Sequence, residues 1–222
     1  MFILTKMIKS ALRRQDFVSC FVIGPQGSGK TTYAMLVLHE IYKDWDNVLR
    51  HLYFDPREAL PELKNALRSG SRMPLIVFDD AGLHLSKYLI SSNKEGFHLV
   101  RLINGLFNLI RTLTAGVIFT SPDMDILKEL RKKAWVVAEP TAPHGVEDPS
   151  RLAKLYRKRI APSGKVYIHK LGYDAYDLRA IPNDVRAEYE EKRRAAMEPL
   201  LEELEALWVG KTPTPPTNPT RA

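Results

Sequence analysis

The chain has 222 residues, and 45% of them are hydrophobic, which is enough for one buried core of ordinary domain size with some length to spare. Lys and Arg exceed Asp and Glu by 33 to 26, so the formal net charge of +7 favours a polyanionic partner or an anionic membrane surface. The single cysteine, Cys20, excludes an internal disulfide framework, and no segment reaches the roughly 20 apolar residues that a membrane span needs. We therefore expect a cytoplasmic protein without a transmembrane segment.

Apolar and amphipathic segments alternate through the first two thirds of the chain. Residues 1–16 mix apolar side chains with Lys and Arg and predict a short amphipathic helix. Apolar segments predict strands at residues 17–23, 51–55, 74–80, 116–120 and 134–138. Segments with helical spacing predict helices at residues 31–43, 57–68, 95–113 and 123–133. This alternation predicts an α/β domain over residues 17–140, in which helices cover both faces of a parallel sheet.

The pattern changes after Pro140. Two strand-like segments predict an antiparallel β-hairpin, at residues 152–160 and 165–171. Helical spacing resumes near Asn183, with a break or restart at Pro199, so residues 141–210 predict a hairpin followed by C-terminal helices. Residues 211–222 are rich in proline and polar side chains, and we expect them to be disordered.

A phosphate-binding motif lies between the first predicted strand and the first helix of this domain. It matches G-x-x-x-x-G-K-[ST] in full and consists of Gly24, Pro25, Gln26, Gly27, Ser28, Gly29, Lys30 and Thr31. Glycines let the backbone curl so that its N–H groups face phosphate, and the helix N-terminus adds positive potential. We expect Lys30 to reach the β- and γ-phosphates of ATP, Thr31 to bind Mg²⁺, and Thr32 to cap the helix or contact the α-phosphate.

Two acids end the third predicted strand of the domain, at the edge of the sheet where parallel-sheet ligands bind. Asp79 is expected to hold Mg²⁺ through water, and Asp80 to orient and deprotonate the attacking water. A strand that simply ends in two solvated aspartates is the alternative. The fourth strand ends in Thr120 and Ser121, whose hydroxyls could sense the γ-phosphate or form an ordinary turn.

An arginine that stabilises the charge of the transition state is expected near this site, from the same subunit or a neighbouring one. Arg131 is the first candidate because it lies in the helix that follows the fourth strand. Arg111 and Arg101 on the preceding helix are rivals, and each of the three could equally be a solvated helix residue.

Taken together, the P-loop and the two strands that end in Asp79-Asp80 and Thr120-Ser121 resemble the ASCE class of P-loop ATPases, over about residues 17–139. Within that class the chain resembles the AAA+ initiator and helicase-loader group, including small ATPases of archaeal viruses and plasmids. The resemblance implies a five-stranded sheet in the order 5-1-4-3-2, and a ring or filament with ATP between identical subunits. The chain departs from the AAA+ pattern after the fifth strand, where a hairpin is predicted in place of a helical lid with a sensor arginine.

The predicted hairpin is the most basic part of the chain. Residues 151–170 contain seven Lys and Arg residues and no acid. The residues expected to bind nucleic acid are Arg157, Lys158, Arg159, Lys165, Tyr156 and Tyr167. Cations can neutralise phosphates while aromatic rings stack on bases. The alternative is a solvated hairpin whose tyrosines pack on the core.

These features predict a Mg²⁺-dependent ATPase that acts on nucleic acid, DNA in the first place, as a replication initiator or helicase loader of a virus or plasmid. The first alternative is a motor for DNA transfer, packaging or extrusion, in the style of FtsK-HerA or Zot-like ATPases. Further alternatives are a small-molecule kinase and a nucleotide-gated scaffold that scarcely hydrolyses ATP. We expect a homo-oligomer with ATP at its subunit interfaces, and a helicase or another protein as a further partner.

Overall fold

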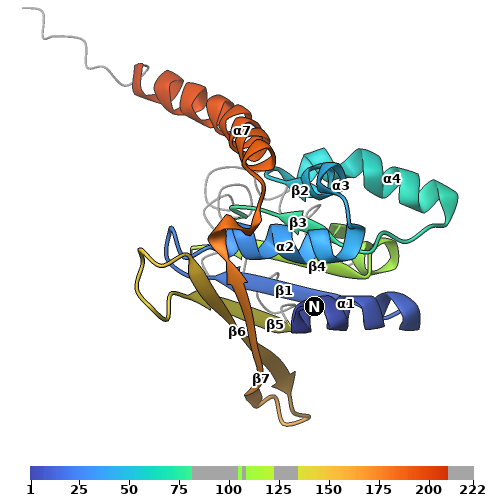
Figure 1. The fold of residues 1–222 in the computed structure, drawn as a ribbon. Coiled ribbons are helices and arrows are strands. Elements are labelled where there is room, and N and C mark those ends of the chain that lie inside the picture. The colour runs from blue at the N-terminus through green and yellow to red at the C-terminus, as the bar shows by residue number, and fades with distance from the viewer. Residues whose placement is uncertain (82–104, 107–108, 123–134, 210–222) are drawn as a thin grey trace, which may run out of the picture.

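The computed structural model describes residues 1–81, 105–106, 109–122 and 135–209. In this part of the chain, seven strands form one sheet in the spatial order β2-β3-β4-β1-β5-β6-β7 (Figure 1). Strands β1 to β5 are parallel. Read from β5 to β2, their order is 5-1-4-3-2, as predicted. The α/β fold of the P-loop NTPases is therefore confirmed.

The five parallel strands form the centre of the molecule. Their bounds are β1 Val18–Ile23, β2 Leu52–Tyr53, β3 Ile76–Phe78, β4 Gly116–Ser121 and β5 Val136–Thr141. Apolar runs form these strands because both faces of the parallel sheet are buried. β1 pairs with β4 along its whole length, from Val18 opposite Gly116 to Ile23 opposite Ser121, and with β5 on its other side. The carboxyl ends of β1, β3 and β4 therefore meet at one edge of the sheet.

Helices cover both faces of the sheet. Their bounds are α1 Ile3–Arg14, α2 Lys30–Tyr42, α3 Trp45–Arg50, η1 Pro56–Ala59 and α4 Leu60–Ser69. Along β1, Cys20 and Val22 enter the core beneath α1, α2 and α3. Phe21 enters the other core with α4, where it stacks on Phe119 with ring centroids 4.8 Å apart. The alternation along one strand thus divides the apolar side chains between two cores.

Helix α1 packs on the sheet through Leu4 and Ile8, which are both buried. Its N-terminus meets Asp174 of the hairpin, whose Oδ1 accepts a hydrogen bond from Ile3 N at 2.7 Å. Oδ2 of the same carboxylate accepts a hydrogen bond from the hydroxyl of Tyr33 on α2 at 2.7 Å. A carboxylate at a helix N-terminus complements the helix dipole, so this buried acid joins α1, α2 and the hairpin.

The hairpin consists of β6 Ser150–Ile160 and β7 Val166–Asp177, and it belongs to the main sheet. β6 pairs antiparallel with β5, from Val136 opposite Arg157 to Thr141 opposite Leu152. The sheet is therefore two strands wider than the predicted parallel core. This pairing satisfies the N–H and C=O groups along the edge of β5, which would otherwise lie open.

The C-terminal helix α7 Asn183–Val209 follows a short turn, η3 Leu178–Ala180, and passes without a break through Pro199. The predicted break at Pro199 is therefore wrong. Proline has no N–H to donate to the carbonyl of Ala195, but both residues are exposed, so water can satisfy that carbonyl. Lys192 fixes the helix to the body by donating to Leu49 O at 2.9 Å. The C-terminal end of α7 extends away from the sheet (Figure 1).

Some predicted segments lie outside the described residues. These include the whole helix predicted at 123–133 and the tail at 211–222. Of the helix predicted at 95–113, residues 105–106 and 109–113 are described, and they are helical. Among the described helices, none has the length and apolar character needed to cross a membrane.

Candidate nucleotide-binding site

Residues 24–31 form a glycine-rich turn between the end of β1 and the first turn of α2. The φ angles of Gly24, Gly27 and Gly29 are 152°, 75° and 92°, which is backbone that side chains with a Cβ rarely adopt. Nζ of Lys30 donates to Gly24 O at 2.8 Å and to Pro25 O at 2.9 Å. Burial lowers the pKa of Lys30 from its usual value. The turn therefore holds its lysine against its own backbone.

Gly29 is the point at which the base of the hairpin meets the glycine-rich turn. Its carbonyl accepts a hydrogen bond from the Tyr176 hydroxyl at 3.0 Å. A Cβ added to Gly29 would lie only 2.7 Å from Cδ2 of Leu178. Arg151 is also buried beside this glycine, and its guanidinium donates to the carbonyl of Val146 at 3.1 Å. The base of the hairpin therefore packs against the glycine-rich turn.

Asp79 follows β3 and is fully buried. Thr31 Oγ1 donates to its two carboxylate oxygens at 3.0 and 3.1 Å, Thr120 Oγ1 donates at 2.5 Å, and the Tyr189 hydroxyl donates at 2.8 Å. Burial raises the pKa of Asp79, and the hydroxyl donors oppose this shift because they favour the charged form. The P-loop threonine and the strand-end acid are thus in direct contact, and together they offer the hard oxygen ligands that Mg²⁺ prefers.

Asp80 has a φ of 47°, a left-handed conformation that Asp tolerates better than most residues. Its N–H donates to Thr120 Oγ1 at 2.9 Å, and its Oδ2 lies 3.3 Å from Nη2 of Arg193. Thr120 therefore links the two acids, since its hydroxyl also donates to Asp79. Oγ of Ser121 is buried without a partner among the described residues. Of the two predicted hydroxyls, Thr120 is the one that contacts the acids.

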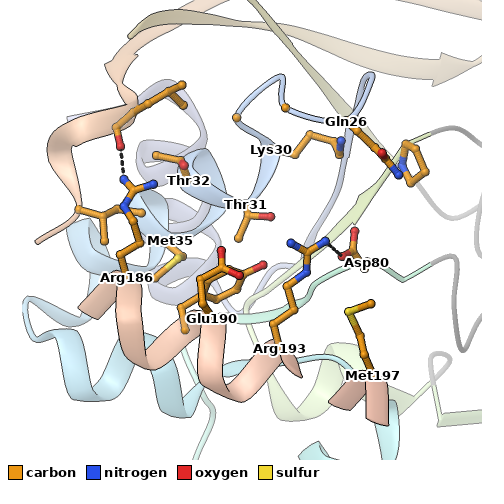
Figure 2. Close-up of a pocket in the computed structure, with 16 residues that line it drawn as sticks. Gln26, Lys30, Thr31, Thr32, Met35, Asp80, Arg186, Glu190, Arg193 and Met197 are labelled. Atoms are coloured by element: carbon orange, nitrogen blue, oxygen red, sulfur yellow. Dashed lines mark hydrogen bonds and ion pairs between the residues drawn. The ribbon is translucent and has the colours of Figure 1, made fainter. Parts of the chain in front are cut away.

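A pocket of about 630 Å³ lies in front of the P-loop. Gln26, Lys30 and Thr31 line one side of it, and Asp80 lies at one end (Figure 2). The opposite side is formed by α7, which contributes Arg186, Tyr189, Glu190, Arg193 and Met197. Figure 2 shows Arg193 pointing toward Asp80, whereas Arg186 points away and donates to Leu178 O at 2.5 Å. The pocket is therefore closed on one side by a helix far along the chain.

Tyr189 and Arg193 are site residues that the sequence does not single out. They lie four residues apart, on the face of α7 that also carries Met197. This spacing is visible in the sequence, but every amphipathic helix has it. Only the position of α7 in the fold shows which of its faces meets the acids.

Of the three arginines predicted for the transition state, only Arg111 lies among the described residues. Arg131 and Arg101 lie outside the described residues. Arg111 lies at the opposite edge of the sheet, where its carbonyl accepts a hydrogen bond from Arg72 at 2.8 Å, so it cannot reach Asp80 of the same chain. Among the described arginines, Arg193 is the one that contacts the acid pair.

The hairpin residues predicted to bind nucleic acid do not form one surface. Alternate residues of a strand point to opposite faces, and this divides the set. Arg157 lies on the side of the sheet that carries α1, because it lines a cavity together with Met7 of α1. Arg159, two residues further along β6, and its cross-strand partner Tyr167 lie on the same side. On the other side lie Tyr156 and Lys158. Lys165 follows the turn, with Nζ 5.5 Å from the centroid of the Tyr167 ring.

The pocket fits the chemistry of a nucleoside triphosphate with Mg²⁺. The turn gives backbone N–H groups and Lys30 for phosphates, and Thr31 and Asp79 give oxygens for the metal ion. Ser28 Oγ is buried in the turn without a hydrogen-bond partner among the described residues. A phosphate oxygen is one group that could satisfy it. Pro25, Gln26 and Thr32 belong to the same turn and first helical residues, and Gln26 and Thr32 line the pocket.

Comparison with known proteins identifies viral relatives, although no protein-family model matches the chain. The chain is 34% identical over 233 aligned positions to the uncharacterized protein B-251 of Sulfolobus spindle-shape virus 1, and the match covers 97% of this chain and 89% of B-251. It is also 34% identical over 123 positions to the uncharacterized protein ORF286 of Acidianus two-tailed virus. That match covers 55% of this chain and 42% of ORF286.

Solved structures give more distant similarities. The N-terminal domain of zonular occludens toxin from Neisseria meningitidis is 14% identical, with a TM-score of 0.39, and the match covers 71% of this chain and 95% of that one. The genome packaging NTPase B204 from Sulfolobus turreted icosahedral virus 2, in complex with AMPPCP, is 13% identical, with a TM-score of 0.33. That match covers 70% of this chain and 98% of B204. These scores are low and assign no activity here. The sequence match to B-251, in contrast, covers nearly the whole length of both proteins. The chain therefore belongs to the same protein family as B-251 of Sulfolobus spindle-shape virus 1.

Proposed function

We propose that this chain is a Mg²⁺-dependent ATPase that acts on nucleic acid. The observation that carries the proposal is the contact between Thr31 Oγ1, in the first turn of α2, and the buried carboxylate of Asp79 at 3.0 Å. This contact brings a hydroxyl and a carboxylate together at a helix N-terminus, where the backbone favours phosphate. Lys30 precedes Thr31 and adds a positive charge at the same place.

Thr31 and Asp79 would hold Mg²⁺, which when bound neutralises charge on the β- and γ-phosphate oxygens. Lys30 would exchange the carbonyl oxygens of Gly24 and Pro25 for oxygens of the same phosphates. The backbone N–H groups of the turn would bind the remaining phosphate oxygens. This part of the site would therefore orient the triphosphate.

Asp80 would orient the attacking water and accept its proton. The hydrogen bond from its own N–H to Thr120 fixes the backbone at this position. Arg193 would take the role predicted for Arg131 and stabilise charge on the γ-phosphate from within the same chain. Its ion pair with Asp80 is partly exposed, with side chains 41% and 27% accessible, so it contributes little stability and can readily be exchanged for a phosphate.

Nucleic acid is the proposed partner because the chain carries a net charge of +7 and the segment 151–170 contains no acid. Binding on the hairpin could influence the ATP site, since Tyr176 and Leu178 contact Gly29. DNA is the first choice, in replication initiation or helicase loading. A motor for DNA transfer, packaging or extrusion is the alternative. Both roles include a homo-oligomer with ATP between subunits and a helicase or other protein as partner.

Phosphoryl transfer to a small molecule is a second candidate. The observation that favours it is α7, which brings Arg193 and Glu190 to the side of the pocket opposite the P-loop, where an acceptor could bind. Release of inorganic phosphate in equal amount with ADP identifies hydrolysis. ADP formed without inorganic phosphate, in the presence of an acceptor, identifies transfer.

The experiment that tests the proposal is ATP hydrolysis by the full chain, with Mg²⁺ or EDTA and with or without single- and double-stranded DNA. Lys30→Ala and Asp80→Asn remove proposed site residues, and Lys64→Ala, an exposed lysine of α4, is the matched control. We expect turnover that requires Mg²⁺, rises with DNA, is lost in both site variants and is unchanged in the control. Turnover that persists in Lys30→Ala would refute the assignment of ATP hydrolysis to the P-loop. Turnover that ignores both forms of DNA at low salt would refute the nucleic-acid partner.

A further inference from the structure

A second cavity lies at the opposite edge of the sheet from the P-loop. The P-loop follows Ile23 at the carboxyl end of β1, whereas this cavity, of about 1040 Å³, includes Val18 at the amino end of the same strand. Met7 of α1, Val136 of β5 and Arg157 of β6 also line it. A ligand bound here would therefore not compete with a nucleotide at the P-loop. The cavity adjoins the α1 side of the hairpin, since Arg157 belongs to both.

Three arginines line this cavity: Arg72, Arg111 and Arg157. Nη2 of Arg72 donates to Asp16 O at 2.6 Å and to Arg111 O at 2.8 Å, so it joins the segment after α1 to the segment before β4. Nε and Nη1 of Arg72 are buried and have no hydrogen-bond partner among the described residues. Arg72 therefore forms a fixed positive part of the cavity wall.

Arg111 and Arg157 are exposed, and neither forms an ion pair within the described part of the chain. Among the described residues that line the cavity, the one acid is Asp16, whose Oδ1 accepts a hydrogen bond from Phe17 N at 2.8 Å. Three cations thus face one acid. Such an excess of positive charge attracts an anion that carries several charges, and phosphate groups fit guanidinium geometry.

Trp135 adds an aromatic surface to this cavity. Its side chain is 47% exposed, although its backbone N–H is held by the carbonyl of Ser19 at 3.3 Å. A half-exposed indole beside guanidinium groups can stack on a nucleic-acid base while the cations contact phosphates. Stacking inside a cavity requires an unpaired base, so the arrangement favours a single strand over a duplex.

We infer that this cavity binds single-stranded nucleic acid, with phosphates on Arg111 and Arg157 and a base stacked on Trp135. The inference rests on the proposed function and deepens it, because it names the surface that holds the nucleic acid and the form that it takes. Arg159 and Tyr167 lie on the same side of the hairpin and extend the path of the strand toward the hairpin turn.

The test is binding of a fluorescein-labelled oligothymidylate to the full chain, followed by anisotropy over a series of salt concentrations. The oligonucleotide should be longer than the usual site of about 4–16 nucleotides. We expect Arg111→Ala and Arg157→Ala to weaken binding and each to lower the slope of log affinity against log salt by about 0.7. Trp135→Ala should weaken binding about fivefold or more. Lys64→Ala, an exposed lysine of α4, is the matched control and should bind like the wild type.

The outcomes separate this inference from the proposed function. Binding by the wild type that Arg111→Ala, Arg157→Ala and Trp135→Ala leave unchanged, with folding verified by circular dichroism, would overturn the inference alone. So would equal losses in Lys64→Ala and Arg157→Ala. Displacement of the oligonucleotide by thymidine monophosphate at the same nucleotide concentration would identify a mononucleotide site and overturn the strand assignment. A wild type that binds no oligonucleotide at low salt would overturn the inference together with the nucleic-acid part of the proposed function.

Discussion

Replacing Tyr189 by Phe tests how much α7 stabilises the buried acid of the site. The Tyr189 hydroxyl donates to Asp79 at 2.8 Å, and the two residues are 7% and 0% exposed. A hydrogen bond to a charged group contributes about 1.5–3 kcal/mol. Phe keeps the ring, which packs on Phe54 with centroids 5.8 Å apart, so little else changes. For a chain of this size, a loss of about 2 kcal/mol lowers Tm by roughly 4–8 °C.

The size of this loss should depend on pH. Burial raises the pKa of Asp79 above its value in the unfolded chain, so its contribution to stability is present at low pH and is lost as pH rises through the folded-state pKa. The Tyr189 hydroxyl favours the charged carboxylate, and its removal raises that pKa further. We therefore expect Tyr189→Phe to lose more free energy of unfolding at high pH than at low pH, where Asp79 is protonated in both proteins.

The assay is urea unfolding in EDTA at a series of pH values, from acidic to alkaline. Tyr173→Phe is the matched control, because the Tyr173 side chain is 61% exposed on the hairpin. A loss in Tyr189→Phe no larger than in this control, or a loss that is the same at every pH, would refute the reasoning.

Three further predictions follow from the site and its surroundings. Arg193→Ala should lower the turnover number for ATP by about 10²-fold and leave nucleotide affinity little changed. Steady-state hydrolysis and nucleotide titration measure the two quantities, and an unchanged turnover number would contradict the role of Arg193. Gly29→Ala should lower the free energy of unfolding by about 1–3 kcal/mol, because φ is 92° and the new Cβ would lie 2.7 Å from Leu178. Gly70→Ala, with φ at 63° and open space around it, should lose less in the same thermal unfolding, and equal losses would refute the steric argument. Cys20 is fully buried, which raises its thiol pKa, so it should react with Ellman's reagent only after unfolding, and rapid labelling of the native protein would contradict this.

Local patterns in the sequence predict much of the core. Five apolar runs predict the parallel strands because a sheet buried on both faces needs continuous apolar residues. The motif that ends in Lys30 and Thr31 requires a turn between strand and helix, and the structure has that turn with three positive φ angles. The strand order 5-1-4-3-2 is different in kind, since it came from the resemblance to known ATPases. It is confirmed, and the hairpin widens the same sheet.

The composition of the candidate site was decided by tertiary structure. Tyr189 and Asp79 are 110 residues apart in sequence, and Arg193 and Asp80 are 113 apart, yet each pair is in contact. Periodicity predicts that α7 is a helix, but it contains no information about what the helix packs against. The division of the basic hairpin between two sides likewise depends on strand pairing. The position of Arg157 and Arg111 at one cavity depends on segments that are distant in sequence. The sequence by itself therefore determined the phosphate-binding turn, the acid pair and the parallel core, because those features are local. Only the fold decided which arginine and which tyrosine meet the acids, because that depends on long-range packing.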